Sequence, residues 1–168
     1  MSEQQLRALL IHASDFAETV FRKKGEVAPM WHAIRANGEQ IIEAHPMWLG
    51  KDLANGLIRA QFDLLDVVRY IYIGEAWTLV RQTGLAKVPG EIEQIKRTGI
   101  ADHPDRVEVV MIQGEDKEAG QIIALREIIR TGKKPKLGPL EFTFEPGSEA
   151  GSSEGRMVGM LPARGTKQ

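Results

Sequence analysis

The stretch MWHAIRANGEQIIEAH, residues 30–45, predicts a β-hairpin and determines the fold class. Asn37-Gly38 lies between two runs of strand-forming residues, 28–36 and 39–45. Asparagine and glycine both tolerate the positive φ angles that a two-residue hairpin turn requires. This hairpin is therefore the antiparallel unit around which the other elements are placed.

A helix is predicted on each side of the hairpin. Ser2–Lys24 has apolar residues at steps of three and four, the period of one helical face. We expect Ser2 and Gln5 to form a capping box at its start, and Gly25 to end it in the left-handed conformation. A second helix is expected over about 51–66. Its apolar stripe consists of Leu53, Leu57, Ala60 and Leu64, widened by Ile58, Phe62 and Leu65.

The second half of the chain is rich in strand-forming residues. Strands are predicted over 67–79, 106–113 and 121–130, and a last one over 140–144, because valine, isoleucine, tyrosine and tryptophan are frequent there. The intervening segment 81–104 is compatible with either a short helix or a loop.

The predicted order is helix, hairpin, helix, then three or four strands. Long neighbouring strands with few crossover helices favour an α+β fold with one antiparallel sheet and helices packed against it. This order is similar to the helix–hairpin–helix–three-strand plan of the roadblock and profilin-like folds. The resemblance is in element order, and no sequence motif transfers a function with it. We expect one domain over 1–145 and a flexible Gly/Ser/Glu-rich tail over 146–168.

Composition excludes several classes of protein. The chain has 168 residues and a mass of 18.7 kDa, and its 22 lysines and arginines nearly cancel its 23 aspartates and glutamates. No overall field therefore favours nucleic acid or an anionic membrane. The absence of cysteine excludes disulfides, thiolate nucleophiles and cysteine-ligated metals. Apolar runs are far shorter than the roughly 20 residues of a membrane span, so we expect a cytoplasmic protein without membrane contact.

Common catalytic motifs are missing from the sequence. No glycine-rich loop ends in Gly-Lys-Ser or Gly-Lys-Thr, and no G-x-G-x-x-G follows a predicted strand. A serine nucleophile needs a rigid turn and a positioned base, which a helix and a flexible tail do not provide. The serines are Ser2, Ser14, Ser148, Ser152 and Ser153. The sequence favours a non-enzymatic binding or regulatory protein without a cofactor. Its expected partner is a second copy, held through the first helix or a sheet edge, or another protein.

The first alternative is a small metal-dependent enzyme of the hydrolase type. A two-residue turn would place His32 opposite Glu43, and His45 projects from the same face as Glu43. Two imidazoles and a carboxylate form a suitable ligand set for one divalent transition metal. The simpler interpretation is a His–Glu pair on a solvated face, and a one-residue register shift would separate the three residues.

A second constellation combines Glu75 with His103 and Arg106. Glu75 can act as a general base while His103 or Arg106 binds the substrate. The favoured interpretation is instead a structural ion pair that ties the strand carrying Glu75 to a neighbouring strand. The candidate partners are Arg106, Glu108 and Arg126.

A basic cluster gives the second alternative, a weak nucleic-acid or phosphate binder. It consists of Arg126, Arg130, Lys133, Lys134 and Lys136. The cluster lacks interleaved aromatic residues, and glycine and proline mark part of it as a loop. A solvated loop is therefore the favoured interpretation, and nucleic acid is not an expected partner.

The remaining candidate binding residues are apolar. Met157, Met160 and Leu161 form a short apolar string after the predicted flexible stretch. Such a string is expected either to fold back onto its own sheet or to dock on another chain. Trp31 and Trp77, together with Trp48, can line a ligand pocket, although a place in the hydrophobic core is the favoured interpretation.

Overall fold

The computed structural model describes residues 1–78, 91–99, 101–146 and 160–161 and has an α+β fold. The helices are α1 (Ser2–Lys24), α2 (Lys51–Leu64) and α3 (Glu91–Thr98). The strands are β1 (Met30–Arg35), β2 (Gln40–Ala44), β3 (Val67–Thr78), β4 (Val107–Asp116), β5 (Gly120–Ile129), β6 (Lys136–Leu137) and β7 (Glu141–Phe144). The predicted order of helix, hairpin, helix and further strands is confirmed. Most of the tail, including Met157, lies outside the described residues.

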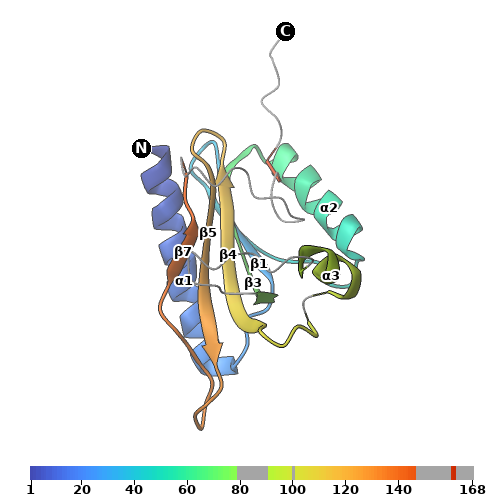
Figure 1. Ribbon diagram of the computed structural model, residues 1–168. Coiled ribbons are helices and arrows are strands. Elements are labelled where there is room, and N and C mark those ends of the chain that lie inside the picture. The colour runs from blue at the N-terminus through green and yellow to red at the C-terminus, as the bar shows by residue number, and fades with distance from the viewer. Residues whose placement is uncertain (79–90, 100, 147–159, 162–168) are drawn as a thin grey trace.

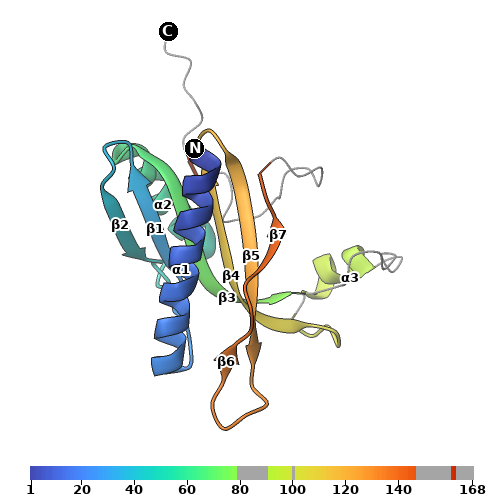
Figure 2. The ribbon, with the colours of Figure 1, turned by 90° about the vertical axis from the view of Figure 1, so that its left-hand side faces the viewer.

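One antiparallel sheet carries a helix on each face. Its strand order is β2-β1-β3-β4-β5-β6, and β7 pairs with β5 beside β6. Figure 1 shows the sheet between α1 and α2, and in Figure 2 α1 crosses the face that is turned toward the viewer. The short strand β6 was not predicted from the sequence. Among the described helices, none meets the length and hydropathy that a bilayer crossing demands.

Helix α1 is a conventional amphipathic helix. Seven of its residues are buried, among them Leu6, Leu10 and Phe21, and Gly25 ends it with a φ of 75°. The predicted capping box is wrong because the helix begins one residue earlier, with Met1 as its N-cap. The Ser2 hydroxyl instead donates a hydrogen bond to the carboxylate of Glu118 at 2.6 Å. The start of the helix is thereby joined to the turn between β4 and β5.

Strand β3 is buried on both faces and divides the core into two. Isoleucines of β3 face α1, whereas Tyr70 and Tyr72 face α2. The α1 core is aliphatic and includes Leu6, Leu10, Ala13, Phe21, Ile71, Ile73, Val110, Ile112 and Ile122. The α2 core is largely aromatic and consists of Trp31, Ala33, Ile58, Phe62, Val67, Tyr70, Tyr72 and Met160.

The hairpin forms, but its predicted register is wrong by one residue. Its loop has three residues, because the Arg35 amide donates to the carbonyl of Glu39 at 2.9 Å and Gly38 has a φ of 85°. Trp31 therefore pairs with Glu43, and His32 pairs with Ile42. A turn that ends in a left-handed glycine is the usual form of a three-residue hairpin loop. The shift turns His32 toward α1 and Glu43 toward α2.

Helix α2 packs with one part of its predicted apolar stripe, the part that contains Ile58 and Phe62. Its buried residues are Ala54, Asn55, Ile58 and Phe62. The predicted stripe of Leu53, Leu57, Ala60 and Leu64 is exposed. The helix carries apolar residues on two faces, and the aromatic α2 core selects the face with the large ring of Phe62.

Two glycines test these packing arguments with opposite expected signs. A β-carbon at Gly114 would lie 2.1 Å from the Tyr70 carbonyl oxygen, whereas one at Gly56 meets nothing within 4 Å. We expect Gly114→Ala to lower the free energy of unfolding by at least about 3 kcal/mol, because two paired strands must separate. Gly56→Ala should raise it by about 1 kcal/mol through helix propensity. Urea unfolding at low protein concentration measures both, and equal effects would contradict the close approach of β3 and β4.

Candidate functional site

The outer face of α2 carries three of the large apolar residues that are exposed on the described part of the chain. Leu53, Leu57 and Leu64 are 65%, 49% and 84% exposed, and the segment before the helix adds Met47 and Trp48, also exposed. We call Leu53, Leu57, Ala60 and Leu64 the α2 stripe. Single exposed apolar residues are common on protein surfaces, but several on one helix face indicate an interaction site.

The stripe was predicted to lie in the core, so its exposure was not foreseen from the sequence. Helix α2 contains a second apolar set at positions 54, 58 and 62, offset by one residue from the stripe. One helix face cannot hold both sets, because residues one position apart lie about 100° apart around the axis. The two overlapping patterns were the signal that one set had to remain outside.

The inner face of α2 packs on a group of aromatic rings around Trp31. The rings of Phe62, Tyr70 and Tyr72 lie with their centroids 5.6, 5.5 and 4.7 Å from that of Trp31. The Trp31 indole Nε1 donates to Nδ1 of His45 at 3.0 Å, so its buried N–H is satisfied. Trp31 is thus a core residue, in agreement with the favoured interpretation, and it is not free to contact a ligand.

The C-terminal apolar string enters this same core. Met160 is only 1% exposed and packs within the α2 core, and Leu161 packs against it while partly exposed. The Met160 backbone also makes a hydrogen bond with the Tyr70 hydroxyl. Burial raises the pKa of Tyr70, so this hydroxyl stays protonated. The two described residues of the string therefore dock on their own chain.

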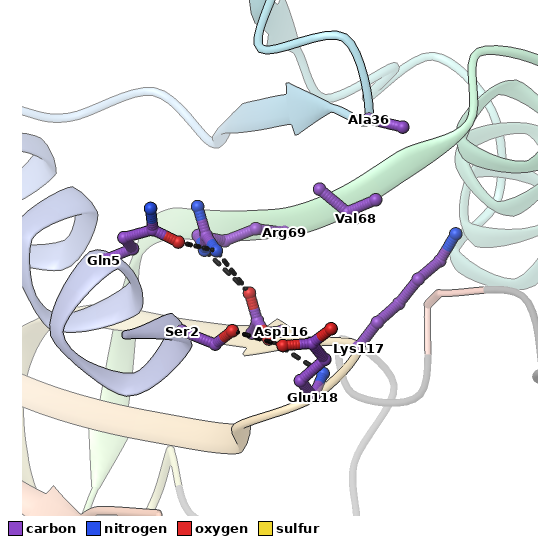
Figure 3. Close-up of a pocket in the computed structure, with 8 residues that line it drawn as sticks. All are labelled: Ser2, Gln5, Ala36, Val68, Arg69, Asp116, Lys117 and Glu118. Atoms are coloured by element: carbon purple, nitrogen blue, oxygen red, sulfur yellow. Dashed lines mark hydrogen bonds and ion pairs between the residues drawn. The ribbon is translucent and has the colours of Figure 1, made fainter.

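A polar hollow of about 370 Å³ lies where the start of α1 meets the β4–β5 turn (Figure 3). Arg69 donates to the Asp116 carboxylate at 2.8 Å from Nε and to the Gln5 side-chain oxygen at 2.7 Å. The hollow is lined by Ser2, Gln5, Ala36, Val68, Arg69, Asp116, Lys117 and Glu118. Its central cation is paired with groups of the protein itself.

The other charged groups of this hollow are also engaged. The second carboxylate oxygen of Asp116 accepts the backbone N–H of Glu118 at 2.8 Å, and Glu118 accepts from Ser2. Lys117 points away from these residues in Figure 3, and its Nζ lies 3.1 Å from the Asp66 carboxylate. The residues that line the hollow therefore hold α1, β3 and the β4–β5 turn together, and we assign them a structural role.

The structure does not assemble the predicted metal ligands. His32 lies against Phe16 of α1, with ring centroids 5.2 Å apart, whereas His45 bonds Trp31 on the opposite face. Glu43 accepts a hydrogen bond from Gln61 of α2 at 3.2 Å. The one-residue register shift is the cause, since it moves His32 to the other side of the sheet from Glu43 and His45. In the described ranges no three His, Asp or Glu residues are grouped to hold a metal ion.

His32 is an unusual buried residue. It is fully buried, and within the described part of the chain neither ring nitrogen has a hydrogen-bond partner. Burial, together with a smaller effect of the nearby His12, whose ring centroid is 6.4 Å away, lowers the pKa of His32 to about 4. His32 is therefore neutral at pH 7 and acts as part of the packing under α1.

Glu75, His103 and Arg106 do not converge on one site. Glu75 accepts the backbone N–H of Val27 at 2.8 Å and lines a small hollow with Trp77. His103 lines a different hollow, and its Nδ1 accepts the N–H of Asp105 at 3.1 Å. The Arg106 guanidinium lies 4.9 Å above the Trp77 ring, so this half-exposed tryptophan is engaged by a cation–π contact.

The predicted basic cluster is divided by ion pairs. Arg126 is buried and lies 2.8 Å from the Glu18 carboxylate of α1, which lowers the pKa of Glu18. Arg126 also donates to the Gly138 carbonyl at 2.7 Å. Arg130 forms two hydrogen bonds with Glu108, at 2.7 and 2.6 Å, and these lower the pKa of Glu108. Arg126 is thus a structural residue that ties α1 to β5. The exposed Lys133 and Lys134 lie on the loop, and the exposed Lys136 begins β6.

Comparisons of the chain with protein-family models, curated proteins and solved structures find no match. The similarity to the roadblock and profilin-like folds is therefore limited to element order.

The neutral state of His32 leads to a testable pH dependence. In the unfolded chain histidine has a pKa of about 6.5, whereas His32 in the folded protein has a pKa of about 4. The unfolded state therefore binds more protons between these values, and stability falls as the pH falls through this window. His32 should cost about 2 kcal/mol of unfolding free energy between pH 7.5 and pH 5.

Urea unfolding of His32→Phe measures this contribution. The variant should lose about 2 kcal/mol less than the wild type over the same pH range. His103→Gln is the matched control, because His103 lines a separate hollow, and it should keep the pH dependence of the wild type. Identical pH dependence in the wild type and His32→Phe would show that His32 is not a buried neutral histidine.

Proposed function

We propose that this protein is a non-enzymatic binding protein that self-associates, and that the α2 stripe is its contact surface with a second copy. The observation that carries the proposal is the row of leucines on α2, 49–84% exposed, which no other described element covers. Solvent exposure of this row is unfavourable, since burying one leucine side chain is worth about 1.5–3 kcal/mol. A partner that covers the stripe recovers this free energy.

The spacing of the stripe supports a helix as the partner element. Positions 53, 57, 60 and 64 are separated by four, three and four residues, the spacing of the seam in a two-helix coiled coil. Gly56 and Ala60 are small and exposed, so a second helix can approach the α2 backbone closely. Leu53 and Leu64 are the large residues at the two ends.

A second copy of α2 has the complementary pattern. In an antiparallel two-fold pair Leu53 lies beside Leu64 of the second copy, and Leu57 lies beside Ala60 of the second copy. Two-fold pairs use the same patch on both chains and are the commonest form of oligomer. The apolar face of α1 is occupied by the chain's own sheet, so among the described helices α2 is better placed than α1 for this contact.

The alternatives from the sequence have less support. The candidate metal ligands lie on opposite faces of the hairpin, and Glu75 and His103 line different hollows. Arg126 is engaged in the ion pair with Glu18 and is therefore not available to bind a phosphate. These arrangements leave the surface of α2 as the best-supported site in the described part of the chain.

The proposal predicts a leucine-dependent dimer. Sedimentation velocity of the wild type at increasing concentration should show a monomer–dimer equilibrium. Leu57→Glu should weaken dimerisation at least about 100-fold, because a two-fold interface loses two leucines and gains two buried charges. Ile11→Glu, which changes an exposed apolar residue on α1, should leave the equilibrium unchanged.

Circular dichroism tests whether Leu57→Glu remains folded, which the exposed position of Leu57 predicts. A wild type that stays monomeric over a 100-fold increase in protein concentration would overturn the proposal. Equal dimerisation of the wild type, Leu57→Glu and Ile11→Glu would place the interface elsewhere.

A further inference from the structure

The space between α2 and the sheet is filled by a residue that belongs to neither. Met160 is buried among aromatic and aliphatic side chains of β1, β3 and α2. We call this the Met160 site, and its walls are formed by Trp31, Ile58, Phe62, Tyr70 and Tyr72. These walls come from three elements of the domain, whereas the occupant comes from the far end of the chain.

The occupant is attached through a long connection. Thirteen residues, 147–159, separate Pro146 from Met160, and they include four glycines, three serines and two glutamates. A chain of this length spans up to about 45 Å when extended. On such a connection the segment can reach the equivalent site of a neighbouring copy that lies within this distance. Docking of Met160 is therefore an association between two parts of the protein that need not belong to one molecule.

The chemistry of the site suits a short apolar peptide. Aromatic rings favour contact with a methionine thioether, which also adapts to irregular spaces. The polar groups of the walls need little from the ligand, because the Trp31 N–H is bonded to His45. The Tyr70 hydroxyl adds one hydrogen bond with the Met160 backbone, and this bond does not depend on the side chain of the ligand. Leu161 supplies a second, partly buried apolar contact.

We propose that the Met160 site is a peptide-binding site for a Met-Leu segment, that Met160 and Leu161 occupy it in cis, and that the same segment of a second copy occupies it in trans. The site lies on the inner face of α2, opposite the α2 stripe. A peptide can therefore occupy the site in a chain that does not form the dimer proposed above. In cis the tether gives the segment a local concentration of the order of millimolar, so free peptide competes poorly with it.

The test uses the full chain with an altered anchor. Met160→Asp should vacate the site, because an unpaired carboxylate is not stable among aromatic rings. The expected result is a melting temperature about 10 °C lower than that of the wild type. Met47→Ala is the matched control, since Met47 is exposed, and it should melt as the wild type does. All variants carry Leu57→Glu, so that peptide binding is measured without dimerisation through α2.

The probe is a synthetic peptide with the sequence GRMVGMLPAR, residues 155–164. At 100-fold above its Kd it should raise the melting temperature of Met160→Asp by about 5–8 °C. The same peptide should not shift the chain with an intact tail, because its site is already filled. A peptide that carries the Met160→Asp change is the negative control.

Recovery of the melting temperature by the peptide, and not by the control peptide, supports the proposal. An unchanged melting temperature of Met160→Asp would show that Met160 anchors nothing. A lowered melting temperature without recovery by 1 mM peptide would show that the segment does not bind in trans. Should Met160→Asp fail to fold alone, refolding in the presence of the peptide, followed by circular dichroism, gives the same distinction.

Discussion

The architecture depends on the double burial of strand β3. Residues 70–73 alternate between tyrosine and isoleucine, and each type faces a different layer. A register shift of one residue would place the tyrosines under α1 and the isoleucines under α2. Both cores oppose such a shift, because the side chains of β3 would no longer fit the space in either of them. The positions of β1 and β4, which pair with β3 on its two edges, follow from this constraint.

The two layers that β3 separates are built differently. Helix α1 buries seven residues and is also held by the Arg126–Glu18 pair and the contacts of Ser2. Helix α2 buries four residues, and part of its packing comes from Met160. Local stability in proteins follows the amount of buried apolar contact. The α2 layer is thus the less stable one, and both proposed binding surfaces belong to it.

The sequence was sufficient to predict the helices and strands, but not to predict which face of each is buried. The 3.6-residue period of α1 and the strand-forming runs depend on local chemistry, and both were predicted correctly. The hairpin register depends on whether Gly38 closes a two-residue or a three-residue loop, and Asn37-Gly38 is compatible with both. The orientation of α2 depends on which of its two apolar faces meets Trp31 and Tyr70, residues distant in sequence. The predicted metal site failed because it relied on the hairpin register alone.

The position of α2 between the two proposed sites has a thermodynamic consequence. Its inner face packs on Met160, and its outer face carries the leucine stripe. Because α2 buries only four residues and packs on Met160, a segment bound at the inner face helps to hold α2 on the sheet, and a dimer through the outer face requires α2 in that position. Each event thus lowers the free-energy cost of the other, because α2 has to be fixed on the sheet only once for both. By linkage the effect is reciprocal: occupancy of the Met160 site strengthens the α2 contact by the same factor by which that contact strengthens peptide binding. Met160 can in this way control the association of the opposite face of α2.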